Sequence, residues 1–142
     1  MITKKTKICI VDYGFGNIAS IENALDYLKF DYSSQKIPKD LDNFSHIILP
    51  GVGSFEAGMG KLTELGWETN IKNFVKKGGY LFGICLGMQL LFKHGTDEKT
   101  DQIIEGLGFF EGKCKKFFQD KKTNKLPLPH VGFNEVIHKN TK

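Results

Sequence analysis

The segment Gly83-Ile84-Cys85-Leu86-Gly87 places a cysteine at the centre of a Gly-x-Cys-x-Gly pattern. This is the spacing of a nucleophile elbow, the sharp turn between a strand and a helix that exposes a nucleophilic side chain. The turn is so tight that the residues two before and two after the nucleophile must lack side chains. The amino end of the following helix favours a thiolate, and its free N–H groups can stabilise an oxyanion. The pattern predicts Cys85 as a nucleophile.

The alternative is that Cys85 is a small buried residue between two packing glycines. An apolar run, residues 80–84, precedes it and a helical segment follows it, which favours the nucleophile. Cys9 alternates within a strand-like run and Cys114 lies between lysines, so we expect structural roles for both. Three cysteines without a Cys-x-x-Cys pair indicate neither a disulfide framework nor a metal site.

Two further features could assist Cys85. The loop Pro50-Gly51-Val52-Gly53 can bring backbone N–H groups close to a ligand, because glycine tolerates unusual dihedral angles. Taken alone, this loop is better explained as an ordinary strand-to-helix turn. Gln89 lies one helical turn after Cys85, where it either binds a polar substrate or faces solvent. The segment 12–17 matches a dinucleotide-binding fingerprint only in part, which disfavours a nucleotide site.

Short apolar runs alternate with helical segments along most of the chain. Strands are predicted at 7–12, 32–37, 46–49 and 80–84, and helices at 18–28, 55–65, 70–77 and 86–93. This order is typical of an α/β fold with an open, mostly parallel sheet covered by helices on both faces. Ligands of such sheets bind at the carboxyl ends of the strands, where loop 50–53 and the Cys85 turn both fall. After residue 107 only strand-like pieces follow, at 108–110, 114–119 and 132–138.

The net charge of +4 is the excess of 20 basic over 16 acidic residues, and every basic residue is a lysine. Arginine is the residue best suited to clamp phosphate and read guanine, so the basic residues favour a solvated face over a nucleic-acid site. No apolar run approaches the roughly 20 residues that cross a membrane. The first residues lack the pattern of a signal peptide, and the expected compartment is the cytoplasm.

Four motifs occur in order, at 12–18, 49–55, 83–89 and 129–134. Together they resemble the glutaminase subunits of imidazole glycerol phosphate synthase, which are class I glutamine amidotransferases. The resemblance implies that Cys85 attacks the side-chain amide of glutamine, giving a glutamyl thioester and ammonia, and then glutamate, without a cofactor. It implies an oxyanion hole formed by the backbone of Gly51, Val52 and Gly53 with the N–H of Leu86. It also implies that Gln89 helps to hold the glutamine.

The resemblance further implies a partner, a cyclase subunit of the (β/α)8-barrel type, in a heterodimer. With the ammonia, this partner makes imidazole glycerol phosphate and an aminoimidazole carboxamide ribotide in histidine biosynthesis. The motif that would face it contributes His130, Gly132, Phe133 and Asn134. The family usually has Trp at the position of Phe133, and Phe133 with Glu135 is similar to paralogues that feed surface-polysaccharide sugar amidotransferases. Three alternatives stay open. The chain could supply ammonia to such a sugar amidotransferase, it could dock on a partner without catalysis, or it could be another cysteine hydrolase.

A cysteine amidase also needs a base to move the thiol proton to the departing ammonia. The family supplies it as a His-x-Glu motif beyond the Pro-His-x-Gly stretch. Here only His130 and His138 lie in that part of the chain, and neither has an acidic residue two positions later. We therefore expect a single glutamine amidotransferase domain over residues 1–142, truncated at its C-terminus, without appreciable glutaminase activity alone.

Overall fold

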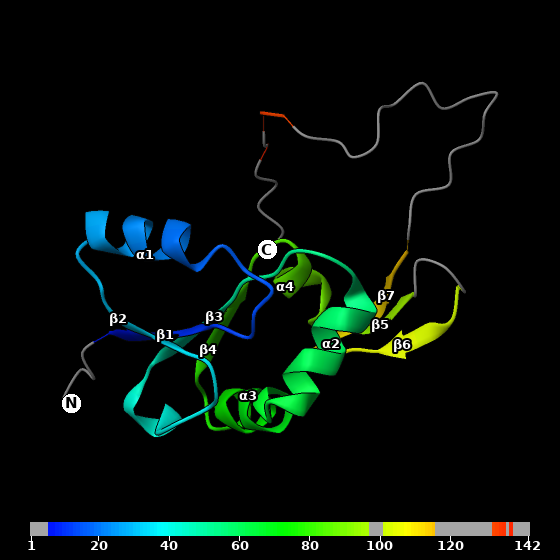
Figure 1. Ribbon diagram of the computed structural model, residues 1–142, viewed down its shortest axis with the longest axis horizontal. Helices are drawn as coiled ribbons and strands as arrows, with labels where there is room; N and C mark the ends of the chain where they lie inside the picture. Colours follow the sequence, from blue (N-terminus) through cyan, green and yellow to red (C-terminus); the bar gives the residue numbers. More distant parts are fainter. Residues whose placement is uncertain (1–5, 97–100, 116–131, 136, 138–142) are drawn as a thin grey trace.

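The computed structural model describes residues 6–96, 101–115, 132–135 and 137 (Figure 1). Its main element is a four-stranded parallel sheet in the order β2-β1-β3-β4. The strands are β1 Lys7–Val11, β2 Asp31–Gln35, β3 His46–Leu49 and β4 Tyr80–Gly83. Three helices connect them, namely α1 Ile18–Tyr27, α2 Phe55–Glu64 and α3 Trp67–Lys76. This arrangement confirms the predicted α/β class with a mostly parallel sheet.

Helices cover both faces of this sheet, with α1 above it and α3 below it in Figure 1. The two faces follow from the alternation of side chains along β1. Ile8 and Ile10 pack with Leu25 of α1 in a small core. Cys9 and Val11 point the other way, into a larger core that includes buried residues of α2 and α3, among them Met59, Leu62, Trp67, Ile71 and Phe74.

Local signals fix where the long helices begin. The side chain of Asn17 accepts a hydrogen bond from the N–H of Ser20 at the start of α1 (3.3 Å), and Ser54 caps α2 in the same way. The third helix begins at Trp67, three residues before the predicted start, because the left-handed Gly66 precedes it. The Trp67 ring is fully buried, and its Nε1–H donates to the carbonyl of Lys36 (2.9 Å).

The predicted helix over 86–93 is wrong in its second half. The helix α4 spans only Leu86–Gln89, and the chain then enters β5, Phe92–Thr96. This strand forms a second sheet in the order β6-β5-β7 with β6 Ile103–Glu105 and β7 Phe110–Cys114. Gly95 lies directly against the Phe55 ring, and the rings of Phe92 and Phe110 pack at 5.8 Å. Strand pairing and aromatic packing therefore override the helical pattern after Leu91.

The strand-like pieces predicted near the C-terminus are borne out only in part. Of 108–110, only Phe110 lies in a strand, and of 114–119, Cys114 ends β7 while residues 116–119 lie outside the described residues. The strand predicted over 132–138 is wrong for the described positions, since 132–135 and 137 have no regular structure and are exposed. A short 3-10 helix, Leu41–Asn43, was not predicted.

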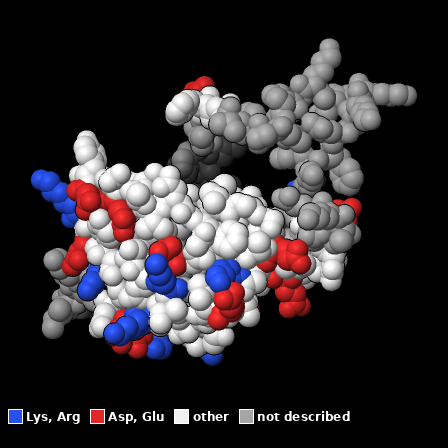
Figure 2. All heavy atoms as spheres, in the orientation of Figure 1, with Lys and Arg blue, Asp and Glu red and all other residues white. Residues whose placement is uncertain are grey.

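Lysines and carboxylates lie interspersed on the face shown in Figure 2. Several pair with each other at the surface, including Lys72 with Glu68 (2.8 Å) and Lys77 with Asp42 (2.7 Å). Such exposed pairs stabilise the fold little. Within the described ranges, no helix has the length and apolar character needed to cross a membrane.

Candidate active site at the Cys85 elbow

Cys85 lies between β4 and α4 in a strained backbone conformation. Its φ is 54° and its ψ is −115°, a combination that residues with a side chain rarely adopt. Such strain costs on the order of 1–3 kcal/mol and persists only where the surrounding structure holds it in place. The Cys85 residue is also exposed, unlike the other two cysteines. The elbow, residues 83–87, therefore presents this thiol at the carboxyl end of the sheet.

The two glycines of the elbow are required by close backbone contacts. A Cβ atom on Gly83 would lie 2.6 Å from the Cα of Met88. A Cβ atom on Gly87 would overlap the carbonyl oxygen of Leu49, at the end of the neighbouring strand β3. These contacts hold α4 against β3 and β4, and any larger residue would push the helix away. The structure thus gives the steric reason for the Gly-x-Cys-x-Gly spacing.

The loop Pro50–Gly53 follows β3 and lies against the elbow; we call it the oxyanion loop after the role that the sequence resemblance predicts for it. A Cβ atom on Gly51 would lie 2.7 Å from both the N of Gly87 and the Cβ of Leu86. Gly53 adopts a φ of 103°, which strongly favours glycine. The side chain of Val52 is exposed. The structure therefore brings together the backbone of the loop and the start of α4, which the sequence places 35 residues apart.

The amides expected to bind an oxyanion have protein partners in this structure. The N–H of Leu86 donates to the carbonyl of Gly51 at 3.3 Å, and the N–H of Val52 donates to the carbonyl of Phe15 at 2.7 Å. The first of these bonds is longer than the usual 2.9–3.0 Å and is the weaker of the two. An oxyanion would have to replace the Gly51 carbonyl as the acceptor of the Leu86 N–H.

Tyr13 is a residue of this site that sequence reasoning missed. Its ring is buried, and its hydroxyl donates to the carbonyl of Pro50 at 3.0 Å. Burial, and after it the charge of the nearby Cys85, raises the pKa of Tyr13. The available signal was the position of segment 12–17 at the carboxyl end of β1, the strand that pairs with β3. Three of the four motifs therefore meet at one place.

The sequence matches the CobB/CobQ-like glutamine amidotransferase domain over residues 9–130. The chain belongs to this family. Its relatives include subunit HisH 1 of imidazole glycerol phosphate synthase from Prochlorococcus marinus, 42% identical over 137 residues, and subunit HisH from Bacillus subtilis, 39% identical over 134 residues. Each match covers 94% of this chain and 62% of the relative. The chain thus spans about three fifths of the length of the curated relatives it matches.

A solved structure supports the fold of this amidotransferase domain. A crystal structure described as a glutamine amidotransferase superposes with a TM-score of 0.62 at 22% sequence identity. The superposition covers 76% of this chain and 55% of the other. At that identity the likeness shows the fold alone, and it agrees with the parallel sheet and its helices.

The other residues that the sequence analysis singled out, namely Gln89, Cys9 and the expected partner-facing residues, lie in separate parts of the domain. Gln89 ends α4, where its N–H donates to the carbonyl of Cys85 (3.1 Å) and its carbonyl accepts from the thiol of Cys114 (3.7 Å). Cys9 is fully buried, and burial raises the pKa of its thiol to about 12. The proposed partner residues Gly132, Phe133 and Asn134 are exposed, and His130 lies outside the described residues.

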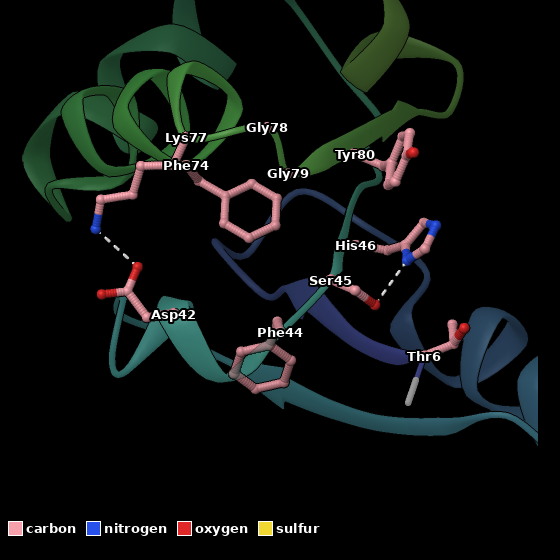
Figure 3. Close-up of a pocket in the computed structure, with 10 residues that line it drawn as sticks. All are labelled: Thr6, Asp42, Phe44, Ser45, His46, Phe74, Lys77, Gly78, Gly79 and Tyr80. Carbon is pink, nitrogen blue, oxygen red and sulfur yellow. Dashed lines mark hydrogen bonds and ion pairs between the residues drawn. The ribbon is translucent and has the colours of Figure 1, made fainter. Parts of the chain in front are cut away.

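A separate cavity of about 560 Å³ opens at the amino ends of the strands, away from the elbow (Figure 3). His46 and Tyr80 stack there with their ring centroids 4.9 Å apart, and the Ser45 hydroxyl lies 2.8 Å from Nδ1 of His46. His46 pairs in register with Tyr80, five residues before Cys85. At about 3.3 Å per residue, that separation is roughly 16 Å, which excludes His46 as a base for Cys85.

Proposed function

We propose that this chain is a glutaminase domain and that Cys85 is its nucleophile. The observation that carries the proposal is the position of the exposed, strained Cys85 with the oxyanion loop packed against the first residue of α4. An exposed thiol at such a turn can attack a carbonyl carbon, and backbone N–H groups can stabilise the oxyanion that forms. The family to which the chain belongs provides the substrate class, a glutamine side-chain amide.

The reaction has two steps. The Cys85 sulfur attacks the amide carbon, the C–N bond breaks, and the thiol proton leaves with the nitrogen as ammonia. Water then attacks the glutamyl thioester, which releases glutamate and restores the thiol. Each step passes through a tetrahedral oxyanion, which we propose is bound by the N–H of Leu86 together with backbone of Gly51, Val52 and Gly53. Gln89, one turn after Cys85, is proposed to hold the glutamine.

Oxyanion binding requires changes in the contacts of this structure, first at the Leu86 amide. The Leu86 N–H must exchange the Gly51 carbonyl for the substrate oxygen. Because an anionic acceptor forms a stronger hydrogen bond than a neutral carbonyl, the exchange favours the tetrahedral state over the planar amide. The 3.3 Å bond to Gly51 is the contact most easily given up.

The test is covalent labelling with 6-diazo-5-oxo-L-norleucine, which loses N2 and leaves a thioether on a thiol at a glutamine site. This reagent needs an assembled site and a thiolate, whereas turnover of glutamine also needs a base. Within the described part of the chain, no histidine is hydrogen-bonded to Cys85. Labelling therefore tests the site without requiring turnover. Peptide mapping should show one adduct, on Cys85, that L-glutamine slows. Cys85→Ala should abolish it and Cys114→Ala should leave it unchanged. No adduct, or an adduct mainly on Cys9 or Cys114, would contradict the proposal.

We further propose that the ammonia passes to a cyclase subunit of the (β/α)8-barrel type in a cytoplasmic heterodimer. Support comes from the names of the relatives, which are subunits of imidazole glycerol phosphate synthase. Phe133, fully exposed here where the family usually has Trp, favours a sugar amidotransferase partner as the alternative. Co-purification of the chain with each candidate partner decides between them. Binding to either one without glutamine-dependent ammonia transfer would indicate a docking role only.

A further inference from the structure

The Tyr13 hydroxyl joins the segment after β1 to the loop after β3. Tyr13 is 1% exposed, and its hydroxyl oxygen lies 3.0 Å from the carbonyl oxygen of Pro50. The hydroxyl also lies close to Gly51, since a Cβ atom placed on that glycine would be 2.8 Å from the hydroxyl oxygen. The contact is therefore with the first residue of the oxyanion loop, at the carbonyl of the peptide that joins Pro50 to Gly51.

We propose that Tyr13 is a positioning residue for the oxyanion hole and that its hydroxyl fixes the Pro50–Gly53 loop against the elbow. The inference rests on the proposed glutaminase function. Pro50 and Gly51 are adjacent, and the Gly51 carbonyl touches the Leu86 N–H. A displacement of the Pro50 carbonyl is therefore passed, one peptide later, to the amide that we assign to the oxyanion.

Without the Tyr13 hydroxyl, the Pro50 carbonyl would lose its hydrogen-bond donor, and the loop would move. A buried carbonyl without a hydrogen bond is unfavourable, so the loop would shift until its carbonyl found another donor. Among the described residues, two other backbone hydrogen bonds restrain the loop: the Val52 N–H donates to the Phe15 carbonyl (2.7 Å), and the Gly51 carbonyl accepts from the Leu86 N–H (3.3 Å). Phe15 itself packs beside Tyr13, with ring centroids 5.7 Å apart. The bonds from Tyr13 and to Phe15 thus tie the loop to the segment after β1, and the Leu86 bond ties it to the elbow.

The hydroxyl is a permanent donor over the working range of pH. Burial and the charge of Cys85 both raise the pKa of Tyr13, so the phenol stays protonated when Cys85 is a thiolate. The role of Tyr13 is then geometric, since it neither gives up nor takes a proton. A purely structural role, in which the ring fills space and the hydroxyl is incidental, is the alternative to test.

The experiment compares two alkylating reagents on Cys85 of the 142-residue chain at pH 9, followed by peptide mapping. A glutamine-like chloroketone reacts through a tetrahedral oxyanion, whereas iodoacetamide reacts by direct displacement of iodide and needs no oxyanion hole. We expect Tyr13→Phe to slow the chloroketone about fivefold to tenfold, the effect of losing one hydrogen bond, and to leave the iodoacetamide rate within about twofold. Tyr27→Phe, at a position 86% exposed on α1, is the matched control and should change neither rate.

Replacement of Tyr13 by 4-aminophenylalanine, which keeps a donor at the same place, should restore the chloroketone rate. An equal fall in both rates, or no change in either, would overturn the positioning role. Failure of the chloroketone to label Cys85 in the unsubstituted chain would instead refute the proposed function. If the chloroketone labels Cys85 but Tyr13→Phe leaves the ratio of the chloroketone rate to the iodoacetamide rate unchanged, only the role of Tyr13 is refuted.

Discussion

At the scale of single residues, the cysteines lie in different environments. Cys85 is exposed at the strained elbow, whereas Cys9 is fully buried in β1 and its pKa is raised to about 12. An unfolded cysteine titrates near 8.5. The folded state therefore binds the Cys9 proton more tightly than the unfolded state does. The contribution of the Cys9 thiol to the free energy of unfolding is fully present below about pH 8.5 and is lost as the pH rises toward 12.

We accordingly predict that the free energy of unfolding falls above pH 9. One such group contributes a slope of up to about 1.4 kcal/mol per pH unit. Urea unfolding of the unsubstituted chain and of Cys9→Val at several pH values between 8 and 11 measures this slope. The substitution keeps an apolar side chain of similar size and removes the titration, so its slope should be shallower. Identical slopes would show that Cys9 titrates alike in both states.

At the scale of elements, the contact of α4 with the end of β3 decides whether the elbow forms. Gly87→Ala places a methyl group on the Leu49 carbonyl oxygen, and we expect it to destabilise the fold by about 3 kcal/mol or more. Gly60→Ala is the matched control, because nothing lies within 4 Å of a Cβ atom at that position of α2. It should be neutral or stabilise by about 0.5–1 kcal/mol. Equal free energies of unfolding for the two variants would contradict the packing described here.

Sequence reasoning located most elements of the parallel sheet, because apolar runs and helical spacing are local signals. It failed at α4 and β5, where the tertiary contact of Gly95 with Phe55 ends the helical pattern early. It also placed the Gly-rich loop and the elbow at the same edge of the sheet, since parallel strands end together. Tyr13 escaped notice because its bond to Pro50 joins residues 37 apart and depends on the register of β1 with β3.

At the scale of the whole molecule, β4 is one of the two edge strands that the main sheet has among the described residues. Tyr80 and Phe82 lie on it with 68% and 63% of their surface exposed. An apolar edge without charged residues is a template for pairing with another chain. We expect self-association that rises with concentration in sedimentation velocity, and we expect Phe82→Lys to reduce it. Tyr27→Lys, on α1, should have little effect, and a monomer at all concentrations would contradict this expectation.

The central claim for the whole molecule is that the Cys85 elbow is a glutamine site. The most direct test is the rate at which iodoacetamide alkylates Cys85 and Cys114 with increasing L-glutamine, with D-glutamine as the matched control. We expect saturable protection of Cys85 by L-glutamine, little protection by D-glutamine, and no effect on Cys114. Alkylation of Cys85 at the same rate with and without L-glutamine would contradict a glutamine site at the elbow.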